Sequence, residues 1–153
     1  PRLTPREVLR YFGRLYGMDD ALIETRTREL AALLGMDDFL DKRCDRLSSG
    51  MKQKVNVSRT VLHDPPVLIL DEPTVGLDIL TSRTIVEFVK DRRRQGKCVI
   101  FSTHIMGEVS RLCDRLAIVH HGRLQFIGTL DELRARTGDD LEQSFITLLE
   151  RAE

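Results

Sequence analysis

The chain has 153 residues, of which 41% are hydrophobic and 31% charged, and its 24 Lys and Arg balance its 24 Asp and Glu. This length has room for one domain or for a piece of a larger one, which excludes two complete enzyme domains. The balanced charge creates no overall field toward nucleic acid or anionic lipid, so we expect no nucleic-acid partner. No apolar run approaches the ~18 residues of a membrane-spanning helix and no signal-peptide pattern opens the chain, so we expect a cytoplasmic protein.

Three cysteines, Cys44, Cys98 and Cys113, are odd in number and widely spaced. This spacing fits neither a disulfide framework nor a zinc site, so we expect reduced thiols in packing positions. The chain starts at Pro1 and enters a helix signal almost at once, which suggests a chain cut from something longer.

Residues 1–62 have the apolar spacing of helices. Thr4, Pro5 and Glu7 supply a cap, a first-turn proline and the closing residue of a capping box. The residues predicted to form the apolar face that follows are Val8, Leu9, Phe12, Leu15 and Tyr16. The tetrapeptide Gly-Met-Asp-Asp occurs at 17–20 and again at 35–38, where it predicts the start and the end of a second helix.

Ser48 is the predicted N-cap of a third helix, in the segment Leu-Ser-Ser-Gly-Met at 47–51. Small residues leave the first backbone N–H groups of such a helix uncovered, and an exposed helix N-terminus suits a phosphate. An ordinary capped amphipathic helix explains the same residues equally well.

From residue 67 the pattern changes to short apolar runs that alternate with helical stretches, which is typical of a parallel α/β sheet. Segments 67–70 and 98–101 are the clearest candidates for buried strands, with a helix over 80–94 between them. Ile85, Val86 and Val89 are predicted to form the apolar face of that helix. Further on we expect a β-hairpin of 116–119 and 123–127, and two helices near 129–136 and 140–152.

Two acids, Asp71 and Glu72, directly follow the first of these strands. Carboxylates at the carboxyl end of a buried parallel strand lie where α/β folds bind ligands. In a Walker B arrangement, Asp71 would hold Mg²⁺ through water and Glu72 would orient the water that attacks the γ-phosphate. On this motif alone, an acidic pair that caps the turn before Pro73 explains the same residues equally well.

Four motifs in a fixed order resemble those of the ABC ATPase family. Segment 47–51 resembles its signature motif, Asp71 and Glu72 its Walker B pair, 75–78 its D-loop and His104 its switch histidine. The residues at 50–54 and 76–78 are similar to those of ATP-binding subunits of exporters of the sodium-efflux and drug-efflux type.

This resemblance implies part of an α/β P-loop NTPase fold, the ABC-type nucleotide-binding domain with its helical subdomain, parallel core strands and terminal β-hairpin. The helical subdomain would span 1–64 and end in the signature helix. The second half of the ATPase core would span 65–128, and a C-terminal helical tail 129–153.

The resemblance also implies ATP and Mg²⁺ as cofactors and ATP hydrolysis that energises a separate membrane permease, at the inner face of the cell membrane. The subunit would form a head-to-tail dimer with a second ATP-binding subunit. Glu72 and His104 would be catalytic and Asp71 would hold Mg²⁺ at one nucleotide. The residues expected to contact the other nucleotide, across the dimer, are Ser48, Ser49, Gly50, Met51 and Asp78, with Gly50 admitting the phosphate close to the backbone.

The chain departs from the family pattern in three places. The phosphate-binding sequence Gly-x-x-x-x-Gly-Lys-[Ser/Thr] does not occur in the 153 residues, so we expect the chain alone to be inactive. Ser49 stands where the family usually has glycine and Met51 where it commonly has glutamine, from which we expect retained function with altered affinity. The missing part of the sheet predicts exposed apolar sheet surface and marginal stability.

Two alternative functions share these motifs. DNA-maintenance ABC ATPases insert long coiled coils before the signature, whereas residues 1–46 show no sustained heptads. A non-catalytic module that only donates its signature helix to a catalytic partner stays open because the phosphate loop is absent.

Overall fold

The computed structural model describes residues 2–138 and 140–150, and the chain divides into two compact units, Pro1–Ser102 and Thr103–Glu153. The first unit holds the expected helical segment and a two-stranded parallel sheet, and the second holds a β-hairpin with three helices. Among the described residues, no helix is long and apolar enough to cross a membrane.

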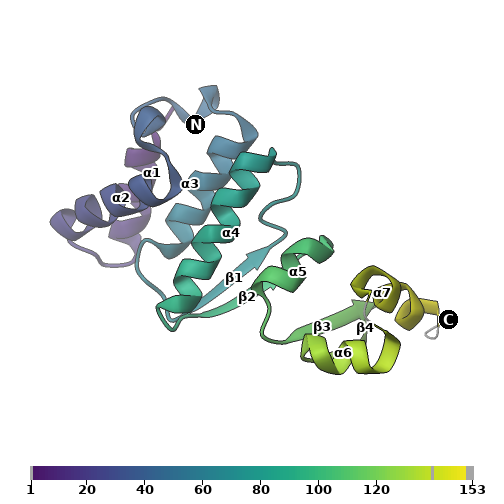
Figure 1. Cartoon of the computed structure of the whole chain (residues 1–153). Coiled ribbons are helices and arrows are strands. Elements are labelled where there is room, and N and C mark those ends of the chain that lie inside the picture. Colours follow the sequence, from purple (N-terminus) through teal and green to yellow (C-terminus); the bar gives the residue numbers. More distant parts are fainter. Residues whose placement is uncertain (1, 139, 151–153) are drawn as a thin grey trace. The chain divides into compact units, whose positions relative to one another are not determined.

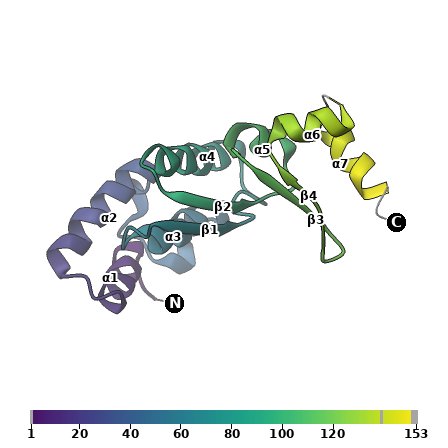
Figure 2. The ribbon, with the colours of Figure 1, turned by 90° about the horizontal axis from the view of Figure 1, so that it is seen from below.

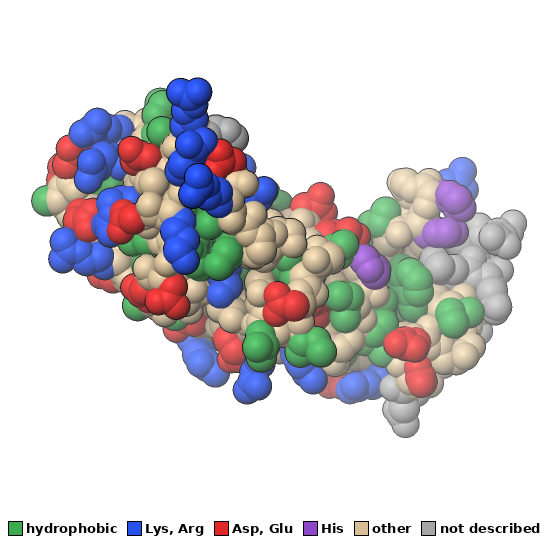
Figure 3. Space-filling view, turned by 90° about the horizontal axis from the view of Figure 1, so that it is seen from above, with side chains coloured by type: hydrophobic (Ala, Val, Ile, Leu, Met, Phe, Trp, Pro, Cys, Tyr) green, Lys and Arg blue, Asp and Glu red, His purple; other side chains and the backbone are tan. Residues whose placement is uncertain are grey.

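The helical segment consists of α1 (Pro5–Leu15), α2 (Asp20–Leu34) and α3 (Ser49–Val61), which pack on one another (Figure 1). The capping box of Thr4 and Glu7 is present, and Gly35 ends α2 with a φ of 60°. Two short 3₁₀ helices that the sequence patterns did not predict, η1 (Asp37–Phe39) and η2 (Cys44–Arg46), connect α2 to α3. Space-filling Figure 3 shows Lys and Arg side chains interspersed with Asp and Glu over this segment. The ion pairs of the segment include those of Arg6 with Glu24 and with Asp41, each at 2.7 Å.

The apolar face predicted for α1 is correct only in its first half. Leu9 is fully buried, and Val8 and Phe12 are half-buried, whereas Leu15 is 64% and Tyr16 52% exposed. In the last turn of α1 the buried position is Gly13, next to Ile23 and Leu62, while Leu15 and Tyr16 point to other sides of the helix. Instead of entering the core, the Tyr16 ring stacks on His63, with 3.7 Å between the ring centroids.

Strand β1 (Val67–Asp71) pairs in parallel with β2 (Cys98–Ser102), and α4 (Ile79–Arg94) connects them and packs on β2 (Figures 1 and 2). Helix α4 buries Ile85, Val86 and Val89 as predicted, together with Phe88. The aligned pairs run from Val67 opposite Cys98 to Asp71 opposite Ser102.

The expectation that both strands are buried is wrong for one face of the sheet. In β1, Leu68 is 1% exposed but Ile69 is 68% exposed, and Ile100 of β2 is 56% exposed. Side chains alternate between the two faces of a strand, so this pattern means that the described residues cover one face and leave the other open. The predicted exposed apolar sheet surface is therefore confirmed.

The second unit begins with α5 (Met106–Leu112), followed by β3 (Leu116–His120) and β4 (Arg123–Gly128), and ends with α6 (Leu130–Thr137) and α7 (Leu141–Glu150). The two strands form the expected antiparallel hairpin, in which His121 and Gly122 take positive φ angles of 45° and 72° at the turn. Ile118 and Phe126 pack on Leu133 of α6 in a small core. Residues 151–152, at the expected end of the last helix, lie outside the described residues.

All three cysteines are free, as expected. Cys44 and Cys113 are half-buried, and burial raises the pKa of the Cys44 thiol. Cys98 is exposed, so its predicted packing role is wrong, because it lies at the open start of β2 where the face is uncovered.

Candidate functional site

Asp71 and Glu72 lie at the carboxyl end of β1, where the sequence placed them. Asp71 is the last residue of the strand, and its Oδ1 accepts a short hydrogen bond from the Oγ of Ser102 on β2. The backbone N–H of Glu72 donates to the same Ser102 Oγ at 2.8 Å and to its carbonyl oxygen at 3.2 Å. One serine on the neighbouring strand therefore orients the first acid and fixes the backbone of the second.

Glu72 has a φ of 41°, a left-handed conformation that non-glycine residues rarely adopt. Such conformations persist where the surroundings hold the backbone, and they concentrate at functional sites. Ser102 supplies that restraint on one side, and on the other the N–H of Val75 donates to the Glu72 carbonyl oxygen at 3.2 Å. Asp71 and Glu72 are both exposed, as residues that bind a soluble ligand must be.

Ser48 caps α3 as predicted, with its Oγ accepting from the N–H of Met51 at 3.2 Å. Ser48 and Ser49 are exposed, so the positive end of the helix dipole and its first N–H groups face outward. Gly50, in contrast, is buried, and a Cβ there would lie 3.1 Å from the Oγ1 of Thr81. Within this chain, the absence of a side chain at position 50 therefore also allows close packing on α4, a role that the sequence did not indicate.

Asp78 is the N-cap of α4. Its Oδ1 accepts from the N–H of Thr81 at 2.9 Å and its Oδ2 from the Thr81 hydroxyl at 2.7 Å. These bonds, the backbone one foremost, lower the pKa of Asp78. Next to it, Ile79 is 85% and Leu80 75% exposed, so the D-loop segment ends in an apolar surface.

His104 lies in the loop between β2 and α5, two residues after the end of β2, and it is exposed. Thr103 organises this loop, because its Oγ1 donates to Glu108 Oε2 at 2.7 Å and accepts from the N–H of Ile105 at 3.0 Å. Since Glu108 is only 7% exposed, the loop is tied to a buried carboxylate. His104 belongs to the second unit and the acids to the first, so their expected meeting stays a prediction.

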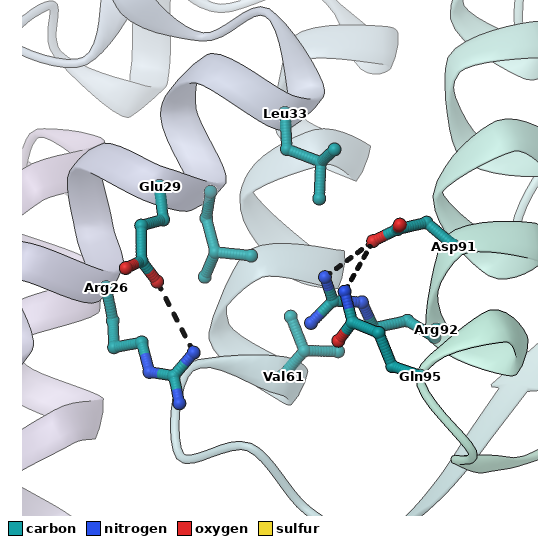
Figure 4. Close-up of a pocket in the computed structure, with 8 residues that line it drawn as sticks. Arg26, Glu29, Leu33, Val61, Asp91, Arg92 and Gln95 are labelled. Atoms are coloured by element: carbon teal, nitrogen blue, oxygen red, sulfur yellow. Dashed lines mark hydrogen bonds and ion pairs between the residues drawn. The ribbon is translucent and has the colours of Figure 1, made fainter.

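A separate pocket of about 330 Å³ opens beside α2, the end of α3 and α4 (Figure 4). Its charged groups pair with one another, Arg26 with Glu29 at 3.3 Å and Arg92 with Asp91 at 2.7 Å, and Gln95 also donates to Asp91. The pocket contains none of the motif residues. Its charged side chains are thus paired, whereas the buried Arg92 Nε has no hydrogen-bond partner among the described residues.

Several residues that shape the site were not found from the sequence. Ser102, Thr81 and Thr103 are single hydroxyl residues whose roles depend on partners in other elements or turns. Gln53 donates from Nε2 to the carbonyl oxygen of Pro73 at 3.0 Å, which ties α3 to the loop after Glu72. Among the described residues no group of three or more His, Cys, Asp or Glu could hold a metal ion.

Comparison with known proteins is decisive for the family. Residues 1–75 match the family model described as ABC transporter. The chain is 40% identical over 151 residues to the ABC transporter ATP-binding protein NatA of Bacillus subtilis strain 168, covering 98% of this chain and 61% of NatA. A solved structure entitled "Structure of ATP binding subunit of ABC transporter" superposes with a TM-score of 0.86 at 34% identity. The chain belongs to the ABC transporter ATP-binding family.

The same organism's linearmycin resistance ATP-binding protein LnrL is 36% identical over 92% of this chain and 45% of LnrL. The solved structure is covered over 62% of its length and 96% of this chain. The chain thus spans about three fifths of NatA and of the solved structure, and less than half of LnrL. The resemblance drawn from the four motifs is confirmed, as is a fold related to an ABC ATP-binding subunit. Proteins of this family bind ATP and generally work with a membrane permease.

Proposed function

We propose that this chain serves in the ATP-binding subunit of an ABC exporter, where ATP hydrolysis energises a separate membrane permease. The observation that carries this proposal is the Asp71–Glu72 pair, held by Ser102 at the carboxyl end of a parallel strand in a chain 40% identical to NatA. The name of LnrL, a resistance protein, supports export as the direction of transport. Sodium and drug-like compounds are the candidate substrate classes.

The three-part organisation at 1–64, 65–128 and 129–153 follows from this proposal. The first part contributes the signature helix α3, the second contributes the acids and His104, and α6 and α7 form the tail. The compact units divide at a different place, after β2.

Asp71 is the proposed Mg²⁺ residue, and its surroundings fit that role. Mg²⁺ prefers oxygen ligands, keeps several waters and is usually bound by one or two carboxylates together with substrate phosphates. Asp71 is exposed, and Ser102 engages Oδ1 of a carboxylate that has two oxygens. The absence of a larger ligand cluster among the described residues suits a cation shared with a nucleotide. When bound, Mg²⁺ neutralises charge on the phosphates.

Glu72 is the proposed general base. Its carboxylate would orient a water molecule and accept its proton as the water oxygen attacks the γ-phosphorus and ADP leaves. The restrained backbone at φ 41° suits this role, since a base must be held in position before the reaction begins. His104 would donate a hydrogen bond to a γ-phosphate oxygen.

The signature residues would act on the nucleotide of a second ATP-binding subunit in a head-to-tail dimer. The exposed N-terminus of α3 offers the Ser48 and Ser49 hydroxyls, backbone N–H groups and the positive end of the helix dipole to a phosphate. Gly50 and Met51 complete this helix turn. Asp78 would reach across the dimer interface, and the exposed Ile79 and Leu80 beside it supply apolar surface for that interface.

The test is the variant Glu72→Gln in the full-length protein, with Glu142→Gln on α7 as the matched control. We expect Glu72→Gln to bind Mg²⁺-ATP as the wild type does but to lower kcat by about 100-fold or more, because the amide cannot accept the proton. Glu142→Gln should leave kcat unchanged. Wild-type turnover by Glu72→Gln would overturn the assignment of the base, and a wild-type protein that binds but never hydrolyses ATP would favour the signature-donating module.

A further inference from the structure

We propose that Gln53 and Thr81 are positioning residues that fasten the signature helix α3 to the Walker B and D-loop segment of the same chain. This inference rests on the proposed function. Its consequence is that the two ATP sites to which one chain contributes are linked within that chain, in addition to any link across the dimer.

The first fastening is the side chain of Gln53, one turn after Gly50 on α3. Its Nε2 donates to the carbonyl oxygen of Pro73 at 3.0 Å, across 20 residues of sequence. Gln53 is half-buried and Pro73 is fully buried, so the bond is partly shielded from water. Proline has no N–H, and its carbonyl oxygen is the only hydrogen-bonding group of the residue. Since Pro73 directly follows Glu72, a movement of α3 pulls on the backbone of the proposed base.

The second fastening lies at the other end of the D-loop. Helix positions 50 and 53 are one turn apart and share a face. On that face, Gly50 approaches Thr81 so closely that a Cβ at position 50 would lie 3.1 Å from Oγ1 and 3.2 Å from Cγ2 of Thr81. The Thr81 hydroxyl in turn donates to Asp78 at 2.7 Å. A movement of the signature helix would therefore displace Thr81, whose hydroxyl holds the Asp78 carboxylate.

Between these two fastenings the D-loop is braced internally. The N–H of Leu77 donates to the Thr74 carbonyl oxygen at 3.3 Å, and the Ser82 hydroxyl reaches the same oxygen at 3.5 Å. Thr74 itself is 2% exposed, and Gly76 takes the left-handed φ of 72° that closes the turn. The loop at 73–78 is short, hydrogen-bonded within itself and attached to α3 at both ends. We therefore expect it to move together with α3, and with it Glu72, Asp78 and the signature turn.

The test removes one fastening at a time in the full-length protein and measures ATP hydrolysis against ATP concentration. Gln53→Leu keeps the size of the side chain and deletes the donor to Pro73. Thr81→Val keeps the contact with Gly50 and deletes the hydroxyl that donates to Asp78, so it breaks the second fastening between Thr81 and the Asp78 carboxylate. The matched controls are Gln125→Leu and Thr84→Val, because Gln125 and Thr84 bond only to backbone oxygens within their own hairpin or helix.

We expect each test variant to lower kcat about tenfold and to bring the Hill coefficient for ATP toward 1, since the coupling between the sites is reduced. The KM for ATP should change by less than about twofold, because neither side chain is placed at the nucleotide. Both controls should retain the wild-type values. A kcat that falls only in proportion to the folded fraction, with an unchanged Hill coefficient, would show a purely structural role and overturn the proposal.

A second measurement separates failure of this inference from failure of the proposed function. Methyl resonances of Val75 and Leu77 report on the D-loop without any need for hydrolysis. They should shift in Gln53→Leu and Thr81→Val, with no comparable change in the controls. Should the wild-type protein lack ATPase activity, the proposed function fails while these shifts still decide the fastening. Unmoved D-loop methyls in both test variants would refute the inference, even in an active protein.

Discussion

The Thr103 hydroxyl connects a buried charge to the loop that carries His104, so we expect Thr103→Val to damage both stability and activity. Thr103 Oγ1 donates to Glu108 at 2.7 Å and accepts from the N–H of Ile105 at 3.0 Å. The substitution preserves the shape of the side chain. It removes the donor from a carboxylate that is only 7% exposed and the acceptor from one backbone N–H.

The expected loss follows from these two bonds. Hydrogen bonds to charged groups contribute about 1.5–3 kcal/mol, and an unsatisfied buried group costs a similar amount. Water can reach the exposed Ile105 backbone, so we assign the main cost to Glu108 and expect a loss of about 2 kcal/mol in the free energy of unfolding. Thr137→Val is the control, because the Thr137 hydroxyl bonds only to a carbonyl oxygen of its own helix, at 2.9 Å. That change should stay within about 0.5 kcal/mol.

The assay combines urea unfolding of the full-length protein with amide hydrogen exchange at Ile105 and steady-state ATP hydrolysis. Thr103→Val should lower stability, speed exchange at Ile105 and reduce kcat, because the backbone on both sides of His104 loses its anchor. Equal stability of Thr103→Val and Thr137→Val, with Ile105 exchanging at the wild-type rate, would show that the Thr103 hydroxyl does not anchor this loop.

Three further predictions concern the cap of α4, the packing of α1 and the thiols. The pKa of Asp78 is lowered by its bonds to Thr81, so the cap should be complete above the unfolded pKa of about 3.9 and be lost as the pH falls through the lower folded value. NMR titration of the Thr81 amide should show this step in the wild type. Persistence of the step in Asp78→Asn would mean that another group causes it. In Gly13→Ala the new Cβ would lie 2.5 Å from Ile23 Cγ1, so overpacking by about 1–3 kcal/mol should exceed the helix-propensity gain of about 1 kcal/mol, and a raised Tm would contradict this. Iodoacetamide should alkylate exposed Cys98 faster than Cys44, whose raised thiol pKa leaves less thiolate at pH 8; mass spectrometry showing the reverse order would be inconsistent with the structure.

Helix caps and strand ends were predicted well because they depend on contacts between residues close together in the sequence. Thr4 and Glu7 form the expected capping box, Gly35 ends α2 and Ser48 caps α3 through bonds within four residues. The Asp71–Glu72 pair stands at the end of a parallel strand for the same reason, since an apolar run before two acids is a local pattern.

What the sequence could not predict depends on contacts between distant segments. Burial of Gly50 is decided by Thr81, 31 positions later, and the strain at Glu72 by Ser102 on the neighbouring strand. Leu15 and Ile69 are exposed because no other segment of the described chain covers them. The residues next to an apolar side chain in the sequence do not indicate whether another segment will cover it. The four motifs nevertheless identified the family, because their order along the chain is itself a sequence property.

The proposed function requires one chain to supply complementary halves of two ATP sites, which we take to come together between two copies. It is tested most directly by mixing two inactive full-length variants, Glu72→Gln, which lacks the base, and Ser48→Arg, which blocks the signature turn. Half of randomly formed dimers are mixed, and each mixed dimer contains one complete site, so the mixture should regain activity, up to about a quarter of the wild-type ATPase rate that two independent sites would give. A mixture that forms mixed dimers but stays as inactive as its two components would contradict the account.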